Sequence, residues 1–176
     1  VPLEECVRVE CQLLSEQAER LRQAGHNVEI ISGGCTPTAP YYTRDCGLTE
    51  IRSGTYALND LNQIDLGVCT EGEVAATVLT TVVSVPTPER AICDAGSKAL
   101  ATQVGQVSEG FGWLWGEPEG VFYRLNDEHG YLNTGPLSSR PQVGDKLRVI
   151  PPRALTCLNL YNEMVMISEE QVVDVW

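Results

Sequence analysis

Apolar residues near the start of the chain recur at steps of three and four, a spacing that places them on one face of an α-helix. Glu4 and Glu5 suit the positively polarised N-terminal end of such a helix, and Gly25 can end it in a left-handed conformation. The pattern therefore predicts an amphipathic helix over residues 3–24. Its apolar face consists of Leu3, Val7, Cys11, Leu14, Ala18 and Leu21.

A short apolar run and a glycine-rich loop follow this helix. Asn27–Ile31 predicts a brief strand, and the loop Ser32–Thr38 starts directly after it. A helix that leads through a turn into a strand, with a glycine-rich loop at the strand's C-terminal end, is the repeating unit of a parallel α/β sheet or barrel. Because a single parallel strand lacks neighbours on both edges, we expect residues 1–45 to be the last unit of a (β/α)8 barrel whose earlier units are missing from this chain.

After Pro40 the pattern changes to short β-rich runs separated by turn residues, without further helical periodicity of comparable length. This predicts a predominantly antiparallel β-domain over residues 46–176, closed or partly closed into a barrel, so that the fold class is mixed α/β. Val74–Val85 carries Val and Thr on both alternating faces, which is typical of a central strand covered on both sides. The predicted strands are Thr55–Leu58, Val74–Val85, Arg90–Asp94, Gly112–Trp115, Val121–Leu125, Lys146–Ile150, Ala154–Tyr161, Glu163–Ile167 and Gln171–Trp176.

Charge and composition narrow the range of partners. The 176 residues carry 24 Asp and Glu against 12 scattered Lys and Arg, a formal charge of −12, which argues against nucleic acid as a partner. No apolar stretch approaches the roughly 20 residues that span a bilayer, so we expect a soluble protein without a membrane partner.

Seven cysteines, odd in number and never spaced as CxxC, indicate mostly buried thiols in a reducing, cytoplasmic compartment. Since Val1 leads straight into a helix, we expect a processed chain or part of a longer one.

The loop after the first predicted strand has the chemistry of an anion cradle. Gly33 and Gly34 let consecutive backbone N–H groups point into one concavity, and the hydroxyls of Ser32 and Thr36 add donors. The candidate phosphate-binding residues are therefore Ser32, Gly33, Gly34, Cys35 and Thr36. The alternative is a plain turn, made by the two glycines and stiffened by the Thr-Pro pair that follows.

His129 is the best candidate for a general acid or base. Two neighbouring carboxylates, Asp127 and Glu128, can raise its pKa or orient its ring. The alternative is an exposed histidine in a turn. Lys98 would be a Schiff-base nucleophile only if it were buried, and the alternative of a solvated or ion-paired lysine is favoured.

Five segments, taken in order, carry a resemblance along nearly the whole chain. They are Ser32–Thr38, Glu50–Tyr56 with Asn59 and Asp60, Asp94–Leu100, Asp127–Gly130, and Gly144–Leu147 with Ile150 and Pro151. In these segments the chain resembles the C-terminal half of the D-serine dehydratase and D-threonine aldolase family, which depends on pyridoxal 5′-phosphate (PLP) and is related to bacterial alanine racemase. Each segment alone is a weak signal, and their common order makes the match strong.

The resemblance implies a (β/α)8 barrel joined to a β-domain, with the glycine loop at the mouth of the barrel, where its N–H groups hold the phosphate of PLP. It also implies that PLP forms an imine with a lysine on an N-terminal half missing from this chain, so that the chain alone is inactive. The implied substrate is a small D-amino acid, which undergoes either dehydration of the D-serine type or aldol cleavage of the D-threonine type. The implied partner is a second copy in a homodimer or an N-terminal barrel half.

The segment after Ile150 departs from the family. Members carry a metal-binding His-x-Cys or His-x-Asp pair there, whereas this chain has Arg153 and Leu155 at those positions. Arginine does not give up its proton to bind a metal and leucine has no lone pair, so we predict no metal. We hypothesise that Arg153 replaces the positive charge of the metal in holding a substrate hydroxyl or carboxylate, which makes it a second candidate catalytic residue beside His129.

Two functions are consistent with the sequence. In the first, the chain is the C-terminal portion of a PLP-dependent lyase that acts on D-amino acids. In the second, it is a non-catalytic remnant or divergent member whose β-domain serves for dimerisation or partner binding. The lost metal pair favours the second function, whereas the phosphate loop favours the first.

Overall fold

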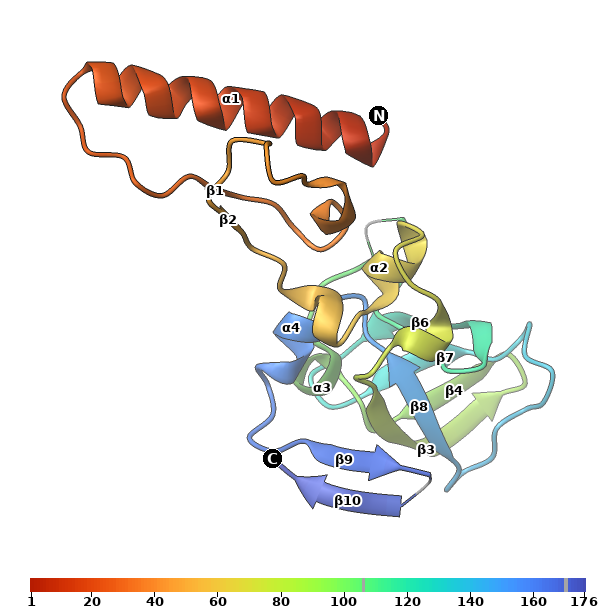
Figure 1. Ribbon diagram of the computed structural model, residues 1–176. Coiled ribbons are helices and arrows are strands. Elements are labelled where there is room, and N and C mark those ends of the chain that lie inside the picture. The colour runs from red at the N-terminus through yellow and green to blue at the C-terminus, as the bar shows by residue number, and fades with distance from the viewer. Residues whose placement is uncertain (106, 170) are drawn as a thin grey trace. The chain divides into compact units, whose positions relative to one another are not determined.

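The computed structural model of the chain describes residues 1–105, 107–169 and 171–176 (Figure 1). The chain divides into two compact units, Val1–Ala57 and Leu58–Trp176. The boundary predicted between residues 45 and 46 lies inside the first of these units. Among the helices of the described residues, none has the length and apolar character needed to cross a membrane.

The first unit begins with one long helix, α1 (Leu3–Gln23), which confirms the helix predicted over residues 3–24. Its buried residues are Val7, Cys11 and Ala18, and all three belong to the predicted apolar face. Leu21, on the same face, is 47% exposed, so the buried stripe narrows toward the C-terminal end of the helix.

A two-stranded parallel sheet follows the helix. The elements after α1 are β1 (Ser32–Gly33), the 3₁₀ turn η1 (Ala39–Tyr41), β2 (Glu50–Ile51) and the 3₁₀ turn η2 (Thr55–Ala57). The strand predicted at Asn27–Ile31 is wrong in position, because backbone pairing with the 49–52 segment starts only at the carbonyl of Ile31. The strand predicted at 55–58 is also wrong. The N–H of Thr55 donates to the hydroxyl of Thr36 over 3.0 Å instead of pairing with a strand.

The second unit contains a closed antiparallel barrel of six strands in the order β3-β4-β7-β6-β5-β8, and the pairing of β8 with β3 closes it (Figure 1). Its strands are β3 (Val78–Thr87), β4 (Arg90–Cys93), β5 (Trp113–Leu114), β6 (Glu117–Leu125), β7 (Gly130–Asn133) and β8 (Lys146–Ile150). This confirms the predicted fold class, a mixed α/β chain with an antiparallel barrel in its C-terminal part. The sequence missed β7, because four residues that begin with glycine carry no alternating pattern of their own.

The strand β3 shows how the barrel buries one face of each strand. Val78, Thr80 and Val82 are buried, whereas Leu79 and Val83 are exposed. The prediction that this strand is covered on both sides is therefore wrong, since a closed barrel covers only the inward face. The barrel core includes Val78, Val82, Ala91, Cys93, Leu114, Phe122, Leu132 and Val149.

Short helices and a terminal hairpin complete the second unit. They are α2 (Leu61–Asp65), the 3₁₀ turn η3 (Glu71–Glu73), α3 (Ser97–Leu100), α4 (Ala154–Leu158), β9 (Val165–Ser168) and β10 (Gln171–Val175). The strand predicted over 154–161 is wrong, because this segment forms α4. The buried carboxylate of Asp60 accepts a hydrogen bond from the N–H of Ala154 over 3.0 Å and thereby fixes the start of that helix.

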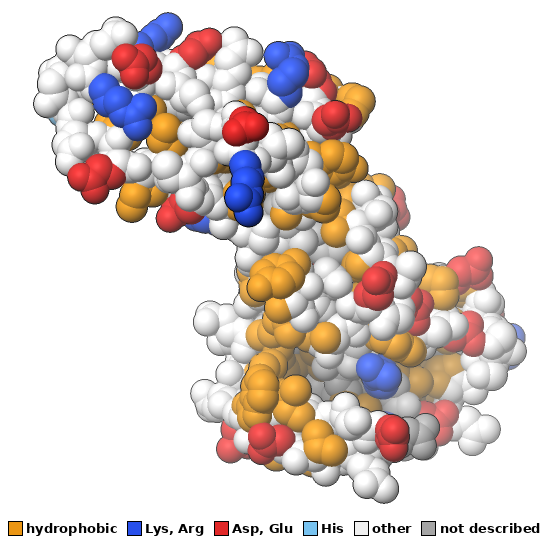
Figure 2. Space-filling model, in the orientation of Figure 1, with side chains coloured by type: hydrophobic (Ala, Val, Ile, Leu, Met, Phe, Trp, Pro, Cys, Tyr) orange, Lys and Arg blue, Asp and Glu red, His pale blue; other side chains and the backbone are white. Residues whose placement is uncertain are grey.

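The hairpin of β9 and β10 is the most exposed apolar part of the second unit. Its large exposed apolar side chains, with that of the final residue, are Val165, Ile167, Val172, Val173, Val175 and Trp176. Figure 2 shows hydrophobic side chains at the surface of this part of the chain, and basic side chains scattered over the visible face. The hairpin therefore adds little to the buried core, which belongs to the barrel.

Candidate functional site

The glycine loop leaves β1 at Gly33 and turns at Gly34, which has a φ angle of +88°. A Cβ atom added to Gly33 would lie 2.9 Å from Leu48 Cδ1, and one added to Gly34 would lie 2.7 Å from Ile51 Cγ2. Gly34 therefore requires glycine, because of its positive φ angle and its close approach to β2. At Gly33 the nearest atoms are the ends of flexible side chains, so close packing favours glycine there. Packing thus accounts for these glycines without any ligand.

The amides of the loop meet acceptors within the first unit. Gly34 N–H donates to Glu10 Oε1 over 3.0 Å, and Cys35 N–H donates to Thr38 Oγ1 over 3.1 Å. The second carboxylate oxygen of Glu10 accepts a hydrogen bond from the hydroxyl of Tyr42. Burial, with a further contribution from this carboxylate, raises the pKa of Tyr42 to about 12. A loop amide that holds a carboxylate has the polarity that anion binding requires.

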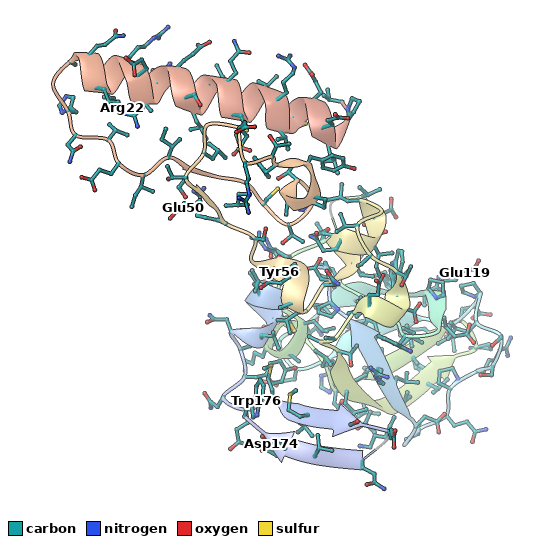
Figure 3. All side chains as sticks on the ribbon, in the orientation of Figure 1. Arg22, Glu50, Tyr56, Glu119, Asp174 and Trp176 are labelled. Atoms are coloured by element: carbon teal, nitrogen blue, oxygen red, sulfur yellow. The ribbon has the colours of Figure 1, made fainter. Side chains whose placement is uncertain are left out.

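A positive charge lies beside Ser32. The guanidinium of Arg52 donates to Ser32 Oγ, and the Ser32 hydroxyl in turn donates to the carboxylate of Glu50, which Figure 3 labels on β2. Thr36 Oγ1 accepts from the N–H of Thr55, which leaves the hydroxyl proton for another acceptor. Sequence reasoning missed Arg52 as a site residue, because only the parallel register of β1 with β2 brings it to Ser32.

In the second unit, the segment after β4 packs on the turn before β7. A Cβ atom added to Gly96 would lie 2.4 Å from the carbonyl oxygens of Asn126 and Asp127, so only glycine permits this approach. The N–H groups of Ser97 and Lys98 donate to these two carbonyls over 2.8 and 3.1 Å. Backbone hydrogen bonds thus join Asp94–Leu100 to Asp127–Gly130, two of the segments that carry the family resemblance.

This packing places Lys98 and His129 at the surface. Lys98 forms an ion pair with Glu128, and both side chains are 65% exposed. The hydrogen bond that Lys98 donates to this carboxylate raises the pKa of Lys98. Lys98 is therefore ion-paired at the surface, as the sequence favoured, and is not a buried Schiff-base nucleophile. His129 is exposed in its turn, and Glu128, one of the two carboxylates expected to act on it, is paired with Lys98. A catalytic role for His129 stays a prediction.

Arg153 is exposed immediately before α4, and Asp60 sets the backbone there. Asp60 is 1% exposed and accepts hydrogen bonds from Gln63 N–H over 3.1 Å and from Ala154 N–H over 3.0 Å. The N–H groups of residues 61 and 62 add hydrogen bonds to the carbonyls of residues 151 and 152. Sequence reasoning missed this role of Asp60. An Asp directly before a short helix is a recognisable N-cap signal, but it does not reveal the second contact.

The segment after Ile150, where the resemblance implies a metal-binding pair, has no metal-binding side chain at positions 153 and 155. Leu155 is 41% exposed, and Cys157 is buried with its Sγ donating to the carbonyl of Ala99 over 3.1 Å. Burial raises the pKa of Cys157 to about 11, so its thiol stays protonated near neutral pH. Among the described residues, no group of three or more His, Cys, Asp and Glu side chains is placed to hold a metal ion.

A closed antiparallel barrel preceded by a helix and a parallel strand pair defines the class of protein, since it is the C-terminal architecture of alanine-racemase-like proteins. The solved structure of D-threo-3-hydroxyaspartate dehydratase from Delftia sp. HT23 matches 99% of this chain and 50% of that one, with a TM-score of 0.85 at 30% identity. Residues 75–167 match the family described as "Putative serine dehydratase domain", and the chain belongs to this family.

Two relatives show how far the match extends. D-threonine aldolase from Arthrobacter sp. is 31% identical over 176 residues, which cover 98% of this chain and 45% of that protein. An uncharacterised protein of Mycobacterium tuberculosis is 30% identical over 123 residues, which cover 68% of this chain and 92% of that protein. The chain thus spans about half the length of the dehydratase and the aldolase. It resembles their C-terminal portion, which confirms the resemblance found in the sequence.

Proposed function

We propose that the complete protein is a PLP-dependent lyase that acts on small D-amino acids, and that this chain forms its C-terminal portion. The observation that carries the proposal is the match of 99% of the chain to D-threo-3-hydroxyaspartate dehydratase at a TM-score of 0.85. The relative from Arthrobacter is a D-threonine aldolase. The named substrates of both proteins carry a hydroxyl on the carbon next to the α-carbon, so a 3-hydroxy D-amino acid is the proposed substrate class.

The glycine loop is the proposed site of the cofactor phosphate. The guanidinium of Arg52 at Ser32 and the proton of the Thr36 hydroxyl are the donors offered to an anion, and the exposed Cys35 leaves the loop open. The Gly34 and Cys35 amides donate to Glu10 and Thr38, so they would reach a phosphate only by exchanging these acceptors for it. Glu10 holds the Gly34 amide and so orients the loop. PLP supplies an electron sink when bound, and the residues of this chain bind and orient its phosphate.

Arg153 is the proposed substrate-binding cation. It is exposed at the start of α4, on a backbone that the buried carboxylate of Asp60 holds in place. A guanidinium at this position can hold a substrate carboxylate or hydroxyl through charge-assisted hydrogen bonds. We propose that this positive charge stands where relatives with a metal-binding pair place a metal.

Cofactor binding by the full-length protein tests the loop. Cys35→Asp adds a negative charge where the phosphate is proposed to bind, so it is expected to weaken PLP binding about tenfold or more. Cys35→Ser, which is neutral and of similar size, is the matched control and is expected to bind PLP like the wild type. PLP affinity is measured by absorbance titration, and borohydride trapping reports imine formation. Equal affinity in both variants would remove the loop from the phosphate site.

Turnover tests the substrate class. The PLP-loaded full-length protein is offered D-serine, D-threonine and D-3-hydroxyaspartate, with the L-enantiomers as controls. Ammonia with a 2-oxo acid indicates dehydration, and glycine with an aldehyde indicates aldol cleavage of D-threonine. Absence of turnover of every D-substrate by protein that has bound PLP would contradict the lyase proposal.

Partner binding by a non-catalytic β-domain is a second candidate function. The relative from Mycobacterium tuberculosis favours it, because 92% of that short protein lies within the match to this chain. Failure of the full-length protein to bind PLP, together with a stable homodimer in light scattering, would support this function over the lyase.

The seven cysteines are free thiols, which supports the cytoplasmic location that we propose under either function.

A further inference from the structure

A cavity of about 300 Å³ opens in the second unit, at one end of the barrel. Its walls come from β8, from the turn between β5 and β6, and from the loop that leads into β8. A volume of about 300 Å³ lies at the lower end of the range for pockets that bind small molecules. None of the residues proposed to bind PLP or substrate lines it.

Three basic side chains line the cavity, although the chain as a whole carries a formal charge of −12. They are Arg140, Lys146 and Arg148, and none of them forms an ion pair within the described part of the chain. Lys146 Nζ donates to the hydroxyl of Thr81 over 2.6 Å, and Arg148 Nε donates to the hydroxyl of Thr77 over 3.2 Å. Neutral hydroxyls therefore position two of the cations without cancelling their charge.

Two carboxylates also line the cavity, and both hold the surrounding loop. Glu117 accepts hydrogen bonds from the hydroxyl and the N–H of Ser138, and Asp145 accepts one from the N–H of Gln142 over 2.8 Å. Three cations against two carboxylates leave the lining with a net charge of +1. Asp94, which is outside the lining, attracts Lys146, while its Oδ1 accepts hydrogen bonds from Thr80 and Thr81 of β3.

Apart from Ser139, the uncharged lining of the cavity is apolar or aromatic. Leu114, Leu137 and Leu147 contribute apolar surface, and Trp115 adds an indole ring. The guanidinium carbon of Arg148 lies 4.2 Å from the centroid of this ring, which holds the arginine against the wall. The cavity thus combines cations with a surface that suits an apolar or planar body.

We propose that this cavity binds a small organic anion. Its carboxylate or phosphate group meets Arg140 and Lys146, and its apolar body lies against Trp115 and the leucines. Arg140 is exposed at the rim, so it is free to turn toward an anionic group that enters. The shared chemistry is an anionic oxygen group on a small apolar body, which a carboxylic acid or a phosphate ester can supply.

Calorimetric titration of the full chain with matched probes tests this site. Benzoate and phenyl phosphate carry the two kinds of anionic group on the same ring, and benzamide replaces benzoate with a neutral group of the same shape. We expect at least one of the two anions to bind and benzamide to bind at least tenfold more weakly. The tighter of the two anions identifies the ligand as a carboxylate or a phosphate ester. Equal binding of benzoate, phenyl phosphate and benzamide would overturn the proposal.

Charge-removing variants locate the binding. Arg140→Gln and Lys146→Gln are each expected to weaken the anion about tenfold, since each removes a charge-assisted hydrogen bond. Arg124→Gln is the matched control, because Arg124 is an exposed arginine like Arg140 but does not line the cavity. Cys35→Asp reports on binding at the glycine loop instead. Unchanged affinity in both cavity variants would contradict the assignment.

Discussion

The two units of the chain complete their backbone hydrogen bonding in different ways. The barrel closes through the pairing of β8 with β3, so each of its strands has a neighbour on both sides. The sheet of the first unit has two strands of two residues each, β1 and β2, and neither has a second partner among the described residues. The barrel is therefore supported by its own pairing, whereas the glycine loop depends on individual side chains such as Glu10 and Arg52.

The two units also bury different amounts of apolar side chain. The barrel has a continuous core around Phe122 and Leu132, both fully buried. The buried apolar residues of the first unit are fewer and smaller, and the loop adds the buried hydroxyls of Thr36 and Thr38. We therefore expect substitutions in the barrel to act mainly through packing, and those in the first unit mainly through hydrogen bonds.

The largest effect is expected from Phe122→Ala. Phe122 is fully buried in the barrel core, so its loss leaves a cavity and should lower the free energy of unfolding by about 3–5 kcal/mol. Urea unfolding of the chain measures the change. The neighbouring Tyr123, which is 47% exposed, gives the control Tyr123→Ala, with an expected loss well below that of Phe122→Ala. Similar losses in both variants would show that the barrel core is not the main source of stability.

The second-largest loss of stability is expected from Asp60→Ala. This change leaves the buried N–H of Ala154 without its acceptor and leaves the N–H of Gln63 with only the backbone carbonyl of residue 60, and it should cost about 2–3 kcal/mol. Asp60→Asn keeps one acceptor oxygen and should cost less. The amide resonance of Ala154 reports the local change by NMR. Asp127→Asn, at an exposed carboxylate, is the control, and an equal loss there would argue against the double contact.

Asp60 also shows where the sequence stops being informative. Its place before α2 is a local signal, but its second partner lies 94 residues away and reverses the structure predicted for that segment, from strand to helix. The helix α1 was predictable because its apolar spacing is contained within one stretch of chain. Arg52 was missed for the same reason that α4 was, since its contact with Ser32 exists only once β2 pairs with β1.

The barrel gives a second example of this limit. Short β-rich runs predicted its class, because each strand and turn has a local composition. The faces of β3 were not predictable, because Val and Thr occur on both of them and only the closure of the sheet decides which face points inward. The loop Ser32–Thr36 was found from its glycines, whereas the acceptors of its amides are Glu10 of α1 and Thr38, directly before η1.

A smaller loss of stability is expected from Glu10→Gln in the first unit. One oxygen of Glu10 accepts from Gly34 N–H and the other accepts from the hydroxyl of Tyr42. The amide keeps one acceptor and adds a donor, so the free energy of unfolding should fall by about 1–2 kcal/mol. The pKa of Tyr42, about 12 in the wild type, should also fall, because the negative charge of Glu10 contributes to its rise.

The combination of Glu10→Gln with Tyr42→Phe separates the contacts of Glu10. If the hydroxyl of Tyr42 is the main partner, the double variant should lose little more than either single variant. If the Gly34 amide is the main partner, the two losses should add. An unchanged pKa of Tyr42 in Glu10→Gln, followed by NMR of its ring carbon, would contradict the contact.

The smallest loss of stability is expected from Asp94→Asn, at a carboxylate directly after β4 whose hydrogen bonds resemble those of Glu10. Asp94 likewise accepts from one N–H, that of Thr81, and one hydroxyl, that of Thr80, each over 2.7 Å. Asp94 is exposed, so solvent screens its carboxylate. The free energy of unfolding at neutral pH should therefore fall by only about 1 kcal/mol, the value of an ordinary hydrogen bond. The barrel around it remains paired, so no wider change is expected.

The pH dependence of this variant gives the sharper test. Burial raises the pKa of Asp94, but the hydrogen bonds from Thr81 and Thr80 and the charge of Lys146 outweigh it and lower the pKa below its ordinary value. The ionised carboxylate therefore stabilises the folded state above the unfolded pKa of about 3.9, and this contribution is lost as the pH falls through the lowered folded pKa. The unfolding free energies of the wild type and Asp94→Asn should converge in acid. Glu119→Gln, at the exposed carboxylate labelled in Figure 3, should show no such convergence, and a constant difference for Asp94→Asn at every pH would mean that these hydrogen bonds do not depend on its charge.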